Sequence, residues 1–289
     1  MEKQKMTNLK DHLACQLLKI DSSLKGGGCY NYKGEIKEYP YILKTETKKE
    51  RYDAVCKWIK GLEVSPESFD KDIMNRYAHH LNSSQVLCYV FFKYLEENEL
   101  LAKFVRKCFP NKNIDTDGLT CEFEYIPQEH SDCYKSRQAT NYDCRIRNNN
   151  KTFELLIEVK YTENKFGNCQ NDESHKEKFE KCYRELIENC KILNADKIEK
   201  FEQMRPYYQL IRNVLQIRED KKIETYCIFL YPYANESVDR HYKEFVESGI
   251  PNESYDSFVK NVYWENLFDC MSEKIKEVYF PEEIFPKIK

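Results

Sequence analysis

The sequence predicts a mixed α/β fold, because helical and strand patterns succeed one another along the central part of the chain. A helical pattern at residues 82–109 is followed by strand patterns at 119–127, 140–147 and 153–163, and a further strand at 224–233 comes after more helices. This order is typical of a central sheet with helices packed against it. The 289 residues are enough to bury a sizeable core.

The composition is that of a soluble globular protein, with 41% hydrophobic and 33% charged residues. No apolar run approaches the roughly 18 residues of a membrane span, and the N-terminus lacks the features of a signal peptide. We therefore expect a cytoplasmic protein with no membrane partner, whose 13 cysteines are reduced. The net charge of −3 leaves any nucleic-acid contact to local basic patches.

The helices of the N-terminal half are predicted from spacing. A short helix is expected at residues 48–62, whereas the glycine-rich stretch 25–34 lacks the Lys-Ser/Thr of a phosphate loop and indicates a flexible turn. In the stretch 82–109, Asn82 is expected to cap the helix with Gln85 as its capping-box partner. Apolar residues recur there at helical spacing: Leu87, Val90, Phe91, Tyr94 and Leu95.

Three strands are expected next. A polar loop separates the first, 119–127, from the second, 140–147, and the turn "NNNK" leads to the third, 153–163. The third reads "FELLIEVKYTE". Its alternate residues are apolar, as in a half-buried strand: Phe153, Leu155, Ile157, Val159 and Tyr161.

The rest of the chain is mostly helical in pattern. Helices are expected at 173–193 and at 207–217, the latter entered just after Pro206. The stretch 224–233 indicates a short buried strand, and the C-terminal part indicates helices with aromatic faces.

Charged residues at the end of the third strand indicate a site. Glu158 and Lys160 share one face, and Asp143 would lie beside them if the second and third strands form a hairpin. Two close carboxylates repel, which favours a divalent cation with oxygen ligands. The Val159 carbonyl could add a ligand. A water on Mg²⁺ could then hydrolyse a phosphodiester, while Lys160 orients or deprotonates that water.

The same residues have a plainer interpretation. Glu158 and Lys160 would form a solvated pair at a strand edge, and Asp143 would merely end its strand. The position of the charges at the end of a strongly apolar run favours the first interpretation.

The stretch "TNYDCRIRNNNKTFELLIEVKYTENKFG", residues 140–167, resembles the hairpin of the PD-(D/E)XK nuclease superfamily. Together with "LNSSQ" before it and "YYQLIRN" after it, the region from about residue 79 to 236 resembles a bacterial restriction-endonuclease-like family. The resemblance implies that Asp143 and Glu158 bind the metal and that Lys160 is catalytic. Tyr142 stands where the pattern has its proline.

From the resemblance we expect a PD-(D/E)XK core at residues 79–236, a mixed sheet flanked by helices. Residues 1–78 would be an accessory segment, and residues 237–289 a helical segment packed on the core. The implied activity is metal-dependent hydrolysis of DNA in restriction or anti-phage defence, with Mg²⁺ or Mn²⁺ as cofactor. A homodimer is expected because cutting both strands needs two sites.

Accessory residues are also expected. Glu124 could supply a third carboxylate or simply face solvent, as Glu122 beside it could. Gln209 shares a predicted helical face with Arg205, Arg212 and Gln216, which could contact a DNA phosphate, orient Lys160 or be merely solvated. Asn82 and Gln85 could reach the site, although capping explains both.

Two other functions stay open on the sequence. The chain could be a nucleic-acid-binding module of the same fold without catalysis, which would bind DNA without cutting it. It could also be a cytoplasmic interaction protein that uses its many Tyr and Phe, which would show no metal affinity at Asp143 and Glu158.

Overall fold

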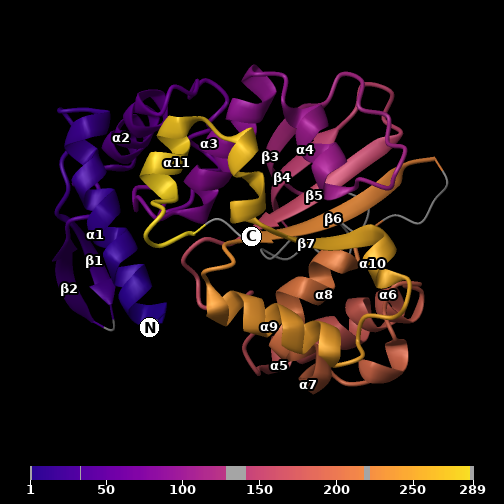
Figure 1. Cartoon of the computed structure of the whole chain (residues 1–289). Coiled ribbons are helices and arrows are strands. Elements are labelled where there is room, and N and C mark those ends of the chain that lie inside the picture. Colours follow the sequence, from indigo (N-terminus) through magenta and orange to yellow (C-terminus); the bar gives the residue numbers. More distant parts are fainter. Residues whose placement is uncertain (1, 33, 128–140, 218–221, 287–289) are drawn as a thin grey trace. The chain divides into compact units, whose positions relative to one another are not determined.

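A computed structural model describes residues 2–32, 34–127, 141–217 and 222–286 (Figure 1). Most of the polar loop expected before the second strand, and Thr140 with which that strand pattern starts, lie outside the described residues. None of the described helices combines the length and the apolar character needed to cross a lipid bilayer.

The chain forms two compact units, which we call the N-terminal unit and the sheet unit. The N-terminal unit comprises Met1–Lys112, Pro232–Ala234 and Tyr263–Lys289, and the sheet unit comprises Asn113–Tyr231 and Asn235–Val262. The division of the chain at residues 78 and 236, inferred from the family resemblance, stays a prediction.

The N-terminal unit is mainly helical. A two-stranded antiparallel hairpin, β1 (Gly28–Tyr32) with β2 (Glu35–Tyr39), forms where only a flexible turn was expected. Rings of Phe91, Phe92 and Trp264 pack edge to face in its core. Its helices are α1 (Glu2–Ile20), α2 (Lys48–Gly61), α3 (Ser84–Glu97), α4 (Leu101–Cys108) and α11 (Glu273–Tyr279), with a 3₁₀ segment at Trp264–Cys270.

The predicted cap of α3 was wrong by one residue. Ser83, not Asn82, is the N-cap, and its hydroxyl accepts a hydrogen bond from the N–H of Val86. A serine hydroxyl at this position satisfies one of the N–H groups that the first turn leaves open. Gln85 therefore has no capping-box role and bonds elsewhere.

The sheet unit contains five strands in the order β3-β4-β5-β6-β7. β4 pairs antiparallel with both β3 and β5, and β5 pairs parallel with β6, so the sheet is mixed as predicted. The strands are β3 (Thr120–Tyr125), β4 (Tyr142–Arg147), β5 (Phe153–Val159), β6 (Glu224–Tyr231) and β7 (Val259–Tyr263). β7 corrects the prediction of helices alone in the C-terminal part.

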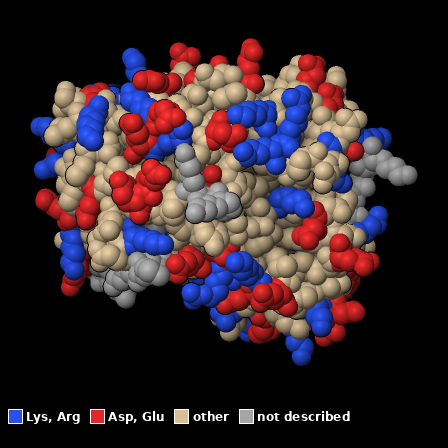
Figure 2. Space-filling model, viewed as in Figure 1, with Lys and Arg blue, Asp and Glu red and all other residues tan. Residues whose placement is uncertain are grey.

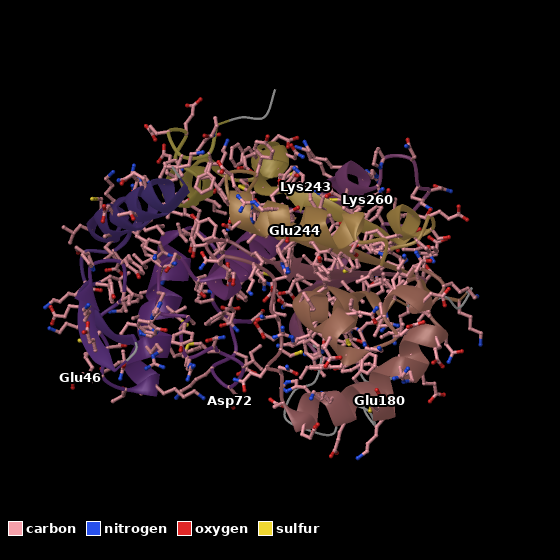
Figure 3. All side chains as sticks on the ribbon, turned by 90° about the horizontal axis from the view of Figure 1, so that it is seen from below. Glu46, Asp72, Glu180, Lys243, Glu244 and Lys260 are labelled. Carbon is pink, nitrogen blue, oxygen red and sulfur yellow. The ribbon has the colours of Figure 1, made fainter. Side chains whose placement is uncertain are left out.

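Helices of the sheet unit lie along one side of the sheet (Figure 1). A π turn at Phe179–Tyr183 joins α5 to α6 within the predicted helix 173–193. Glu180 in this turn pairs with Arg184 and projects outward (Figure 3). The helices are α5 (Glu173–Lys178), α6 (Arg184–Glu188), α7 (Phe201–Met204), α8 (Tyr208–Val214), α9 (Glu236–Glu247) and α10 (Tyr255–Phe258).

The central strand β5 is buried along its whole length, from Phe153 to Val159. The half-buried strand that the alternation predicted was therefore wrong. A strand that has a neighbour at each edge and is covered on both faces reads as a nearly continuous apolar run, as "FELLIEV" does. The two carboxylates in it, Glu154 and Glu158, are each only 2% exposed.

The turn between β4 and β5 is held by one buried side chain, that of Asn148. Its amide oxygen accepts from the N–H groups of Thr152 and Phe153, at 3.0 and 3.1 Å. Its amide nitrogen donates to Asp115 and to the Thr152 hydroxyl. The turn therefore sets the register in which β4 meets β5.

We predict that Asn148→Ala lowers the free energy of unfolding by about 1–3 kcal/mol, because buried N–H groups lose their acceptor. Urea denaturation of both proteins measures the loss. Asn150→Ala is the control: Asn150 is exposed and its amide makes one bond, to Asp115. Equal stability of Asn148→Ala and wild type would show that the turn does not depend on this side chain.

Candidate active site

Asp143 and Glu158 lie on adjacent strands at the end of the β4–β5 ladder. The paired residues of β4 and β5 extend from Arg147 and Glu154 to Cys144 and Ile157. One further step in this register places Asp143 opposite Glu158. Residues opposite one another share a face of the sheet. In place of a further ladder bond, the Asp143 carboxylate accepts the N–H of Val159 at 2.6 Å. The predicted hairpin thus brings the two carboxylates together.

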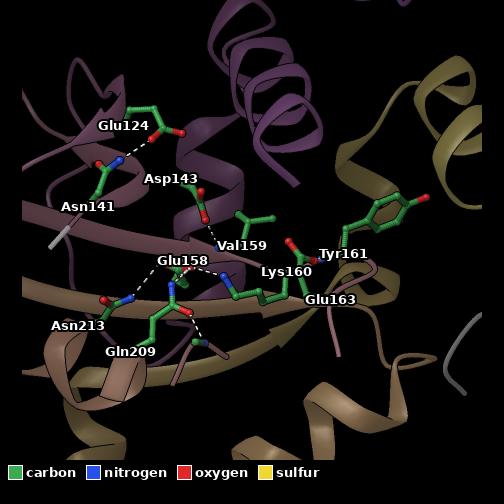
Figure 4. A network of polar contacts seen from close by, with 11 residues as sticks. Glu124, Asn141, Asp143, Glu158, Val159, Lys160, Tyr161, Glu163, Gln209 and Asn213 are labelled. Atoms are coloured by element: carbon green, nitrogen blue, oxygen red, sulfur yellow. Dashed lines mark hydrogen bonds and ion pairs between the residues drawn. The ribbon is translucent and has the colours of Figure 1, made fainter. Parts of the chain in front are cut away.

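The Glu158 carboxylate is surrounded by donors (Figure 4). Its Oε1 accepts from Lys160 Nζ at 2.5 Å and from Gln209 Nε2 at 2.6 Å. Its Oε2 accepts from Asn213 Nδ2 at 3.1 Å. With 2% of Glu158 and 11% of the Lys160 side chain exposed, the pair is buried, and the plainer interpretation of a solvated strand edge is wrong.

The donors on α8 are themselves held in place. The amide oxygen of Gln209 accepts the N–H of Gly167 at 2.6 Å, and the N–H of Gln209 donates to the Gly167 carbonyl at 3.0 Å. A Cβ at position 167 would stand 3.1 Å from that amide oxygen, so glycine suits the close approach. The Tyr142 hydroxyl donates to the carbonyl of Asn213. The first bond fixes the direction of the Gln209 amide, and the last holds the main chain of α8 at Asn213.

Burial and neighbouring charges shift the pKa values of Asp143 and Lys160. Burial, then the charge of Glu158, raise the pKa of Asp143 well above its ordinary value, against the opposing effect of Lys160. Burial alone would lower the pKa of Lys160, but the charges of Glu158, Glu163 and Asp143 raise it. These three carboxylates therefore favour the protonated form of Lys160, whose ammonium donates to Glu158.

Glu124 joins the same row of the sheet. The pairs Phe123↔Cys144 and Tyr125↔Tyr142 flank it, so it faces Asp143 across β3 and β4. Its φ of +52° is rare for a residue with a side chain and interrupts the ladder, a kind of strain that recurs at functional sites. Its carboxylate accepts from the Asn141 amide, and its charge contributes to the raised pKa of Asp143.

A comparison with protein-family models matches residues 23–281 to the family described as "Restriction Endonuclease associating with ARP", REase-ARP. The chain belongs to this family. No curated protein and no solved structure matches it. Membership confirms the resemblance to a restriction-endonuclease-like family and agrees with the mixed five-stranded sheet. It indicates a nuclease with a role in defence.

The place of Gln85 at the site of this REase-ARP chain stays a prediction. Gln85 lies in the N-terminal unit, where its amide accepts from the N–H of Asn75 at 2.8 Å and donates to the Ile73 carbonyl at 3.1 Å. Glu122 pairs with Arg145.

The predicted polar face on the helix after Pro206 was also wrong. α8 begins at Tyr208, Arg205 belongs to a 3₁₀ turn before it, and Gln216 is buried beyond its end. Of the predicted set, Gln209 reaches Glu158. It donates to the carboxylate oxygen that Lys160 also bonds, while its expected contact with DNA or orientation of Lys160 stays a prediction.

Two asparagines of the REase-ARP site were missed. Asn213 follows Gln209 by four residues, the spacing that puts two side chains on one face of a helix, and this spacing could have revealed it. Asn235 donates to the carbonyls of Tyr161 and Glu163, at 3.1 and 2.9 Å, and so fixes the chain directly after Lys160. No pattern in the sequence marks Asn235, because it comes from a distant segment.

The donor set suits a hard divalent cation. Among the described residues, no group of three or more His, Cys, Asp or Glu could hold a metal ion. Mg²⁺, however, commonly takes only one or two carboxylates and keeps several waters. Asp143 and Glu158 supply two. Burial, and after it the charge of Glu158, raise the pKa of Asp143, and a bound cation would favour the charged form of both carboxylates.

We predict that Asp143 makes the metal-free protein less stable as pH rises. A carboxyl whose pKa is raised by folding stabilises the folded state while protonated, and this contribution is lost from about pH 4, near the unfolded value, up to the raised pKa. Asp143→Asn cannot ionise and should be more stable than wild type at pH 7–8 in EDTA, with the difference shrinking toward pH 4. Thermal melting across this range measures it.

The exposed Asp196→Asn is the control and should follow wild type at every pH. A wild type and an Asp143→Asn variant with parallel stability curves would show that burial and the charge of Glu158 do not raise the pKa of Asp143.

Proposed function

We propose that the protein is a metal-dependent endodeoxyribonuclease that cuts foreign DNA in restriction or anti-phage defence. The observation that supports this most is the pair of adjacent carboxylates, the partly exposed Asp143 and the buried Glu158, with Lys160 hydrogen-bonded to Glu158. Membership in a restriction-endonuclease family supports the same activity. The proposed place of action is the cytoplasm.

Asp143, Glu158 and the Val159 carbonyl would hold Mg²⁺, for which Mn²⁺ would substitute. The N–H of Val159 points toward Asp143 on β4. In an antiparallel ladder the N–H and the carbonyl of one residue point to the same neighbouring strand. The Val159 carbonyl therefore points to the side of Asp143, which favours it as a ligand. When bound, the ion would supply an activated water and neutralise charge on a phosphodiester.

Lys160 acts in this proposal as a fixed cation. Its raised pKa keeps the ammonium protonated, so it orients water and stabilises negative charge on the phosphate rather than removing a proton. Gln209 and Asn213 are positioning residues. They hold the Glu158 carboxylate in one orientation, and both of its oxygens are engaged.

DNA would be bound through local groups. On the face shown in Figure 2, basic and acidic side chains are interspersed, in keeping with a net charge of −3. Because cutting both strands of a duplex takes two sites, we propose that a homodimer acts on duplex DNA.

We predict cleavage of plasmid or phage DNA with Mg²⁺ or Mn²⁺ and none in EDTA. Glu158→Gln should abolish cleavage, and Lys160→Ala or Lys160→Gln should slow it by roughly 10²-fold or more.

The matched control is Glu122→Gln, which changes a half-exposed carboxylate of the same sheet and should cut normally. Modified and unmodified DNAs belong in the assay. If the Lys160 variants cut at the wild-type rate, Lys160 has no role in cleavage. If the wild type binds DNA but never cuts it, the protein is a binding module without catalysis.

We predict, separately, that Mn²⁺ or Mg²⁺ raises the melting temperature of the wild type. An ion that binds only the folded state stabilises it by mass action, by about 2.7 kcal/mol at a hundredfold excess over its dissociation constant. The rise should vanish in Asp143→Asn and persist in Asp196→Asn. An equal rise in Asp143→Asn would place the ion elsewhere.

A further inference from the structure

A groove opens in the sheet unit next to the hydrogen-bond donors that surround Glu158. Its volume is about 910 Å³, and it lies between the segment 167–175, which follows the Lys160 strand end, and the α8 residues Tyr208, Gln209 and Arg212. Gln209 belongs to both places, because it lines the groove and donates to Glu158. The groove therefore begins where the carboxylate pair ends. Its volume lies in the range of small-ligand sites.

The lining of the groove includes the cationic side chain of Arg212. The guanidinium of Arg212 stands over the ring of Tyr208, 5.0 Å from its centroid. The Tyr208 hydroxyl is itself bonded to that of Tyr183 at 3.1 Å, so the ring that carries the guanidinium is anchored. A planar guanidinium held in this way presents N–H donors in the fork that matches a phosphate.

The other lining groups suit the uncharged parts of a nucleotide. Cys169 is 8% exposed, and burial raises the pKa of its thiol to about 11, so the sulfur is neutral and apolar. Asn168 and Gln170 on either side of it are exposed and carry both donors and acceptors. Such amides can bond the edge of a base, whichever groups that edge presents.

The acidic groups of the lining are already engaged. Asp172 accepts from the N–H and the Nδ1 of His175, and these bonds, the backbone one first, lower the pKa of its carboxyl. Glu173 pairs with Lys176 at 3.7 Å. Their charges are therefore partly compensated and oppose an anion at Arg212 less than their number suggests.

We propose that this groove holds the nucleotide adjoining the scissile phosphate of a bound DNA strand, with Arg212 on its phosphate and the amides of Asn168 and Gln170 on its base. The assignment rests on the proposed nuclease function. A strand whose phosphodiester lies at Asp143 and Glu158 continues past Gln209 into this groove.

The test is the binding of a short single-stranded oligonucleotide, measured by fluorescence anisotropy in EDTA so that no cutting occurs. Arg212→Gln should weaken binding about tenfold, as expected for a lost hydrogen bond to a charged group, and should reduce the slope of log affinity against log salt by about 1. Arg212→Lys keeps the charge and should keep the salt slope. Lys197→Gln, an exposed lysine outside the groove, is the matched control and should bind like wild type.

The base is tested with an oligonucleotide series in which one nucleotide at a time is abasic. One abasic position should weaken binding by the wild type, and the double variant Asn168→Ala, Gln170→Ala should lose that sensitivity. Both side chains are exposed, so this variant keeps the test valid if an Arg212 variant fails to fold.

The outcomes separate the two proposals. If affinity depends on Arg212 but no DNA is cut with any metal, the groove is a nucleotide site, while the nuclease function falls and with it the place of that nucleotide beside a scissile phosphate. If DNA is cut but the Arg212 and Asn168/Gln170 variants bind and cut like wild type, the groove assignment is overturned and the nuclease function stands. A wild type that binds no oligonucleotide overturns the groove assignment as well.

Discussion

Glu158 lies in the middle strand of a five-stranded sheet with only 2% of its surface exposed. Removing a carboxylate from water costs several kcal/mol unless a cation and hydrogen-bond donors replace its hydration. Lys160, Gln209 and Asn213 do so within 3.1 Å. Because these donors come from α8 and from the residue directly after β5, the need to satisfy one buried charge ties the central strand to that helix.

The same need leaves the site short of positive charge. Asp143 stands opposite Glu158, is only partly exposed, and lies near the same ammonium, that of Lys160. A divalent cation would complete the charge balance, which is the physical basis of the proposed metal site. Gln209 links this site to the groove beside it, since its two amide atoms bond Glu158 and Gly167. Glu158 and the proposed nucleotide groove are therefore parts of one hydrogen-bonded network.

Strand alternation and hairpin register were enough to predict that Asp143, Glu158 and Lys160 meet, because both follow from local sequence. Burial was not predictable in this way: alternation does not reveal whether a second face is covered, so β5 was expected to be half-exposed. Asn213 was missed although its spacing of four residues from Gln209 puts both side chains on one face of α8 and could have revealed it. The fifth strand, Val259–Tyr263, was missed because it is short and follows a helix without a turn signal.

Crystals grown with Mn²⁺ and measured for anomalous scattering test the central claim most directly. The account predicts an anomalous peak bonded to Asp143 and Glu158, with the Val159 carbonyl as a further ligand and the Lys160 ammonium displaced from Glu158. A peak elsewhere, or none at saturating Mn²⁺ with Lys160 still bonded to Glu158, would contradict it. In that case the buried carboxylate and its donors would be a structural ion pair of the fold and not a metal site.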